Sequence, residues 1–245
     1  MEQVKRLRIF AGPNGSGKST IFGLVDKIVR CPNFVNADLI EQALSSKGKL
    51  SFADYSILVD EAVFLQAFRS SGLFVKARDA EKLTGSIKVA DNILTVEPQF
   101  VDSYFSAFVA EFLRLGMLNV VDKFTVETVM SDPAKLDYIR LAKQMGYRIY
   151  LYFIATKDVN INIKRVGQRT EEGGHGVPVE KIIKRYDRSL DNMYSAMQLS
   201  DRAYFFDNSE SEYIWLAEYN GKSQTIYLKV DTVPGWFEKY ILKKM

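Results

Sequence analysis

The chain of 245 residues carries 33 basic and 30 acidic side chains, and its formal net charge is +3 at neutral pH. Because basic and acidic residues are nearly equal in number, the net charge argues against nucleic acid or an anionic membrane as the main partner. A single cysteine, Cys31, excludes an internal disulfide, and no apolar run reaches the ~18 residues of a membrane helix. We therefore expect a cytoplasmic protein with one good core.

A glycine-rich loop lies between the first two predicted elements. Residues 7–11 are typical of a short buried strand, and residues 21–30 predict a helix. The loop fits the phosphate-binding pattern of a glycine, four free positions and Gly-Lys-Ser, with Gly12, Pro13, Asn14, Gly15, Ser16, Gly17, Lys18, Ser19 and Thr20. Its glycines let backbone N–H groups turn inward on an anion. Because Lys18 is expected to reach the terminal phosphates and Ser19 to hold Mg²⁺, the pattern predicts a nucleoside triphosphate site rather than a plain turn.

The next stretch departs from a regular alternation of strands and helices. Residues 33–36 predict a second strand, and residues 39–44 begin a helix for which Asp38 is placed as the cap. The following predicted elements are a helix at 52–69, β-like runs at 73–78 and 86–96, and a helix at 100–115 that ends at Gly116. Because the β-like runs interrupt the alternation, we interpret roughly 50–100 as an α+β insertion.

Alternation resumes in the second half of the chain. The predicted strands lie within 119–126, at 147–155 and at 203–206, and the predicted helices at 133–145, 159–169 and 179–197. The chain closes with a hairpin of 213–218 and 224–230 and a helix at 236–244. Strands that alternate with helices imply a mainly parallel sheet covered on both faces. In such sheets ligands bind beyond the carboxyl ends of the strands.

Acidic and hydroxyl side chains follow the predicted strands at that edge. Asp38 follows the second strand, where a carboxylate can accept a proton from a substrate hydroxyl that attacks the γ-phosphoryl group. A plain helix cap is the equal alternative for Asp38. Glu127, beside Thr128, is placed to hold Mg²⁺ through water or to bind a substrate hydroxyl. The alternative for Glu127 is a charged residue at a solvated strand end.

Arg165 and Arg169 project from one face of a predicted helix. A glycine loop and a second helix follow, so residues 159–190 predict a lid. The arginines of such a lid neutralise the transferred phosphoryl group, and its closure excludes water. An ordinary solvated helical hairpin is the alternative. His175, in the glycine loop, has no second His or Cys nearby, which argues against a metal site.

These motifs together resemble the zeta toxin family of P-loop kinases. The resemblance covers about 1–46 and 105–209 and rests on the phosphate loop, Asn36-Ala37-Asp38-Leu39-Ile40, Glu127-Thr128, Arg165-Val166, Arg169 and Gly173-Gly174-His175. It implies a nucleoside-kinase-like fold with a five-stranded parallel core. It also implies transfer of a phosphoryl group from ATP or GTP, with Mg²⁺, to a hydroxyl of UDP-N-acetylglucosamine.

The resemblance also assigns roles to single residues. It implies that Asp38 is the catalytic base and that Lys18 and Arg165 bind phosphate, with Arg169 as the arginine of the lid pattern. It places Glu127 and Thr128 on the substrate side, and Asn208 where related kinases close over the adenine. The family further implies an antitoxin protein as a partner.

We therefore expect an α/β P-loop NTPase, built as a three-layer sandwich with a helical lid. The domain is expected at 1–209, with the C-terminal hairpin and helix of 210–245 packed on it. The expected activity is ATP/Mg²⁺-dependent phosphorylation of a small-molecule hydroxyl. A nucleotide-switched binding module and a polynucleotide 5′-hydroxyl kinase are the alternatives. The acceptor stays open, because the insertion occupies the region in which the toxins bind substrate.

Overall fold

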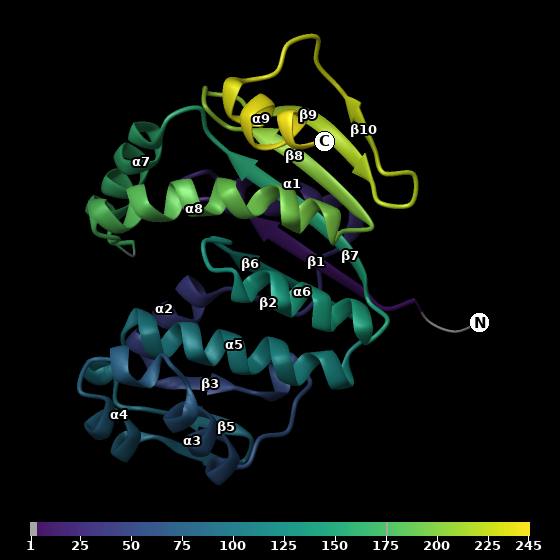
Figure 1. Cartoon of the computed structure of the whole chain (residues 1–245). Coiled ribbons are helices and arrows are strands. Elements are labelled where there is room, and N and C mark those ends of the chain that lie inside the picture. Colours follow the sequence, from purple (N-terminus) through teal and green to yellow (C-terminus); the bar gives the residue numbers. More distant parts are fainter. Residues whose placement is uncertain (1–3, 175) are drawn as a thin grey trace. The chain divides into compact units, whose positions relative to one another are not determined.

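The computed structural model describes residues 4–174 and 176–245, so His175 lies outside the described residues. The chain divides into two compact units (Figure 1). The first unit comprises Met1–Pro32 and Lys123–Met245, and the second unit comprises Asn33–Asp122. Within the described residues, no helix is long and apolar enough to cross a membrane.

The first unit is built on a mostly parallel sheet, which confirms the predicted α/β fold class. Its parallel strands are β1 (Arg6–Ala11), β6 (Lys123–Thr128), β7 (Arg148–Ala155) and β8 (Arg202–Asp207). Strands β9 (Ile214–Asn220) and β10 (Thr225–Leu228) continue the sheet antiparallel, in the order β10-β9-β8-β7-β1-β6. The predicted C-terminal hairpin is therefore part of the same sheet.

Both faces of this sheet are covered. Neighbouring residues of β1 and β7 are buried in succession, and since successive side chains point to opposite faces, neither face is left to solvent. The helices of the first unit are α1 (Lys18–Val29), α6 (Ala134–Gln144), α7 (Val159–Glu171), α8 (Val179–Gln198) and α9 (Gly235–Tyr240). The buried side of α8 is the apolar face predicted from the sequence, with Ile182, Tyr186, Leu190, Met193 and Met197.

The second unit has its own small sheet and an aromatic core. Its elements are β2 (Phe34–Val35), α2 (Ala37–Lys47), β3 (Lys49–Ser51), α3 (Glu61–Ser70), α4 (Ala80–Ser86), β4 (Lys88–Ala90), β5 (Ile93–Thr95) and α5 (Ser103–Val120). Strands β3, β5 and β4 form an antiparallel sheet in that order. The core is dominated by phenylalanine rings in edge and tilted contacts, among them Phe52, Phe64, Phe68, Phe105 and Phe108.

Several boundaries of the second unit differ from the sequence prediction. The helix predicted at 52–69 begins only at Glu61, because the Asp60 side chain caps it by accepting from the N–H groups of Ala62 and Val63. The run at 73–78 forms a 3-10 turn, Phe74–Lys76, rather than a strand. Helix α5 continues through Gly116 to Val120, since Gly116 keeps an ordinary helical backbone. The run predicted as β-like at 86–96 does form β structure, but as two short strands, β4 and β5, that pair antiparallel with each other.

Candidate functional site

The phosphate loop leaves β1 and enters α1 with three glycines in backbone conformations that other residues rarely adopt. The φ angles are +143° at Gly12, +74° at Gly15 and +92° at Gly17. A Cβ at Gly12 would lie 1.9 Å from the carbonyl oxygen of Ile154, so the loop runs too close to β7 for any side chain. Gly17 caps α1 without a side-chain hydrogen bond, and the N-terminus of a helix favours an anion.

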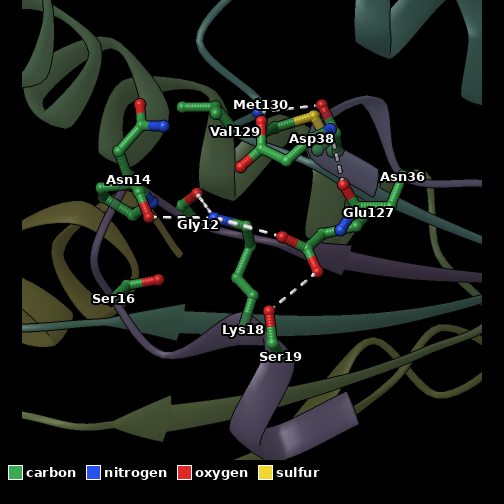
Figure 2. A network of polar contacts seen from close by, with 12 residues as sticks. Gly12, Asn14, Ser16, Lys18, Ser19, Asn36, Asp38, Glu127, Val129 and Met130 are labelled. Carbon is green, nitrogen blue, oxygen red and sulfur yellow. Dashed lines mark hydrogen bonds and ion pairs between the residues drawn. The ribbon is translucent and has the colours of Figure 1, made fainter. Parts of the chain in front are cut away.

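A carboxylate from the neighbouring strand faces the lysine and serine of the loop (Figure 2). Lys18 is 7% exposed, and its Nζ lies 3.0 Å from the carbonyl oxygens of Gly12 and Pro13 and 3.8 Å from Glu127 Oε1. The other oxygen of Glu127 lies 3.5 Å from Ser19 Oγ. The position of Glu127 follows from strand pairing, because β6 runs parallel to β1 with Glu127 opposite Phe10. The structure therefore brings Lys18, Ser19 and Glu127 together.

The loop fits a triphosphate by its polar atoms as well as by its shape. Within the described part of the chain, Asn14 Oδ1 and Ser16 Oγ are buried and have no hydrogen-bond partner. A hydroxyl with no partner near the N-terminus of a helix is a suitable donor to a phosphate oxygen. The oxygens of Ser19 and Glu127 are of the type that Mg²⁺ prefers. The described residues contain no cluster of three or more His, Cys, Asp or Glu side chains able to hold a metal by themselves.

Two asparagines fix the loop from other elements, and the sequence analysis missed one of them. Asn162 of α7 is fully buried and donates from Nδ2 to the carbonyl oxygen of Asn14 over 2.6 Å. Its Oδ1 accepts a hydrogen bond from the Thr156 hydroxyl. Asn208, after β8, donates from Nδ2 to the carbonyl oxygen of Ser16 over 2.9 Å. The sequence did hold one indication that Asn162 is buried: it lies one helical turn before the apolar Val166, on the same side of α7.

The Asn162 network extends to the second helix of the predicted lid. The hydroxyl of Tyr186, on α8, donates to the carbonyl oxygen of Thr156 over 2.5 Å. Burial raises the pKa of Tyr186 to about 12. The phenol therefore stays neutral and acts as a donor across the physiological range. Helices α7 and α8 are thus both joined to the phosphate loop by hydrogen bonds among buried groups.

The two predicted lid arginines occupy different surroundings. Arg165 donates from Nη1 to the carbonyl oxygen of Asn208 over 2.7 Å and from Nη2 to that of Glu210 over 3.2 Å. These two hydrogen bonds hold the Arg165 guanidinium against the turn that follows β8. Arg169 lies one helical turn further on, and its Cγ would be 2.7 Å from a Cβ added at Gly174.

Thr128 and Asp38 are the remaining residues that the sequence predicts for the substrate side of the site. The Thr128 hydroxyl accepts from the N–H of Met130 over 3.1 Å at the end of β6. Asp38 is half-buried in the first turn of α2, in the second unit. The prediction that Asp38 caps this helix is wrong. The cap is Asn36, whose Oδ1 accepts from the N–H groups of Asp38 and Leu39 over 2.8 and 3.2 Å, because the helix begins at Ala37. A catalytic role for Asp38 stays a prediction.

Comparison with known proteins shows similarity of fold at low sequence identity. No known family model matches the chain. A segment of 63 residues is 29% identical to an uncharacterized protein of Haemophilus influenzae and covers 26% of this chain and 45% of that protein. A chain of the AvrRxo1-ORF1:AvrRxo1-ORF2 complex solved with ATP superposes with a TM-score of 0.57 at 18% identity, over 93% of this chain and 61% of that chain. The complex solved with sulphate ions gives 0.57 at 17%, over 92% and 61%.

The similar proteins are longer than the parts that match this chain. This chain spans 61% of the solved AvrRxo1 chain, and its aligned segment spans 45% of the Haemophilus protein. At 17–18% identity the superpositions establish a shared fold. Activity, substrates and partners do not follow from the fold and need their own argument.

Proposed function

We propose that this protein is an ATP/Mg²⁺-dependent phosphotransferase of zeta-toxin type, which transfers the γ-phosphoryl group to a hydroxyl of a small molecule. The observation that carries the proposal is the buried Lys18 beside Glu127 and Ser19, in a loop whose three glycines have positive φ angles that other residues rarely adopt. One structure of similar fold was solved with ATP, which supports a nucleotide at this loop.

The residues of the loop bind and neutralise the nucleotide in this proposal. Lys18 exchanges the carbonyl oxygens of Gly12 and Pro13 for phosphate oxygens, and the N–H groups of the first turn of α1 bind the same anion. Ser19 and, through water, Glu127 hold Mg²⁺, which neutralises charge on the phosphates when bound. Lys18 and Glu127 therefore serve the nucleotide and its metal, while Thr128 stays on the substrate side.

The transfer itself needs a base and a cation. The acceptor oxygen forms a bond to the γ-phosphorus while the bond from that phosphorus to the β–γ bridging oxygen breaks, and ADP leaves. Asp38 takes the proton of the acceptor hydroxyl. Arg169 neutralises the charge on the transferred group. We assign Arg165 to the nucleotide side, because its guanidinium donates to the carbonyl oxygens of Asn208 and Glu210.

The decisive experiment incubates the protein with γ-labelled ATP, Mg²⁺ and a panel of small hydroxyl compounds that includes UDP-N-acetyl sugars. We expect label in a phosphorylated acceptor. Asp38→Asn should abolish transfer and leave ATP affinity nearly intact. Asp54→Asn is the matched control, since Asp54 is an exposed aspartate of the same unit. Joint loss of transfer and ATP binding in Asp38→Asn, or no loss of either, would contradict the assignment of the base.

The same assay separates the competing functions. Label that appears only as free phosphate, together with nucleotide-dependent capture of a protein, would favour a nucleotide-switched binding module. Label on the 5′ end of a single-stranded oligonucleotide would favour a polynucleotide kinase, and its binding should then weaken steeply with salt. The small net charge of +3 argues against the polynucleotide kinase.

A further inference from the structure

The turn that follows β8 is tied to the phosphate loop. The Asn208 side chain donates to the carbonyl oxygen of Ser16, and a Cβ at Gly17 would lie 2.0 Å from Asn208 Nδ2. Asn208 therefore holds one carbonyl of the loop and lies directly against Gly17. Whatever fixes residues 207–210 also fixes the entrance to α1.

A buried carboxylate holds this turn. Asp207 is 6% exposed and is the last residue of β8. Its Oδ1 accepts from the N–H of Ser209 over 2.9 Å, which closes the turn around Asn208. Its Oδ2 accepts from the indole N–H of Trp236 over 2.6 Å. Since a buried carboxylate is strongly unfavourable without donors, loss of the indole donor would leave Oδ2 poorly satisfied.

The donor comes from the C-terminal helix, which is firmly packed. Trp236 is 6% exposed and Phe237 is fully buried. The rings of Trp236 and Phe237 meet edge to face at 5.6 Å, and Phe237 meets Phe205 of β8 at 5.2 Å. The indole N–H is therefore held in place by the core of the first unit. Helix α9 thus presents a fixed donor to the carboxylate behind the nucleotide turn.

We propose that Trp236 is a positioning residue of the nucleotide site: through the Asp207 carboxylate it fixes the turn of residues 207–210 and so holds Asn208 against the phosphate loop. This inference rests on the function proposed above. It assigns a role in nucleotide affinity to the C-terminal segment, which is not part of the residues that resemble the zeta toxin family. In this proposal Trp236 acts through the Asp207 carboxylate and not through a contact of its own with the nucleotide.

The test is Trp236→Phe, which keeps an aromatic ring against Phe237 but removes the indole donor together with one ring of the bicycle. We expect the Kd for Mg·ADP, measured by isothermal titration calorimetry, to rise about three- to tenfold, because a hydrogen bond to a charged group has been lost. At saturating nucleotide, kcat for transfer should stay unchanged. Trp215→Phe is the matched control, since Trp215 is 41% exposed and its indole bonds within β9 to the Ala217 carbonyl. Its Kd should equal that of the wild type.

A second variant keeps the proposal falsifiable if Trp236→Phe folds poorly. Asp207→Asn preserves the size of the side chain and one acceptor oxygen, so it should weaken binding to a similar degree. The double variant should bind no more weakly than the weaker single variant, because both changes break one connection. A purely structural role for Trp236 would lower the melting temperature and leave the Kd unchanged at a temperature where the variant is folded.

Each result decides between the two proposals. A wild-type protein that binds no ADP or ATP would overturn the proposed function, and the inference with it. Wild-type binding together with an unchanged Kd in folded Trp236→Phe would overturn the inference alone. Additive losses in the double variant would also overturn it, because Trp236 and Asp207 would then act separately.

Discussion

Replacement of Gly17 by alanine is the sharpest test of how the phosphate loop is built. Gly17 has φ +92° and ψ +26°, a left-handed conformation that is unfavourable for alanine by about 1–2 kcal/mol. The new Cβ would also meet Asn208 Nδ2 at 2.0 Å and must displace that side chain. Loss of its bond to the Ser16 carbonyl adds about 1 kcal/mol. We expect the free energy of unfolding to fall by about 2–3 kcal/mol in total.

The chain offers the same substitution nearby as a control. Gly23 lies in the interior of α1, and no atom approaches within 4 Å of a Cβ added there. Gly23→Ala should therefore stabilise the protein by up to about 1 kcal/mol through helix propensity. Urea unfolding followed by circular dichroism measures both variants under one set of conditions. A Gly17→Ala protein as stable as Gly23→Ala would refute the geometry of the loop.

A double variant separates the backbone effect from the steric one. Asn208→Ala by itself should lower the free energy of unfolding by about 1 kcal/mol. When it is combined with Gly17→Ala, the two losses should not add, because the amide that Asn208→Ala removes has already been displaced. We expect the double variant to be more stable than the sum by about 1 kcal/mol. Full additivity would mean that Asn208 does not lie against Gly17.

Three further predictions concern groups that the structure places in defined hydrogen bonds. Asn36→Ala removes the acceptor that caps α2 and should cost about 1 kcal/mol in urea unfolding, and a neutral result would contradict the cap. Asn162→Ala leaves buried groups unsatisfied and should cost about 2 kcal/mol, whereas the exposed Asn160→Ala on the same helix should cost under about 0.5 kcal/mol. Because the pKa of Tyr186 is raised to about 12 while an unfolded tyrosine ionises near 10, its stabilising contribution is complete below pH 10 and is lost as pH rises towards 12. Urea unfolding across this range should show a smaller decline in Tyr186→Phe, and an identical decline would refute the raised pKa.

The sequence predicted best the features that depend on local chemistry. The turn between β1 and α1 was predictable because Gly12, Gly15 and Gly17 allow backbone conformations that other residues rarely adopt, while phosphate binding by Lys18 and Ser19 stays a prediction. The parallel strands were recognisable from their apolar runs between amphipathic helices, as with β7. The buried face of α8 followed from spacing alone.

The features that sequence reasoning missed depend on contacts between distant segments. Nothing near Asn162 indicates that its amide meets the Asn14 carbonyl, because that contact exists only once α7 packs beside the loop. The cap of α2 was misassigned because Asn36 and Asp38 are both good capping residues and only the backbone path chooses between them. Gly116 was interpreted as a helix end, although its φ is not positive and α5 continues through it to Val120.

The hydrogen bonds of the phosphate loop explain why these distant contacts matter for function. A loop that binds an anion must turn its N–H groups inward, so its carbonyl oxygens need donors from elsewhere. Lys18 donates hydrogen bonds to the carbonyl oxygens of Gly12 and Pro13. Asn162 donates to the carbonyl oxygen of Asn14, and Asn208 donates to that of Ser16. Both asparagines come from elements that a loop motif does not include. These donors come from α7 and from the turn after β8, so movement of either element would change the backbone conformation of the loop and with it the proposed nucleotide site.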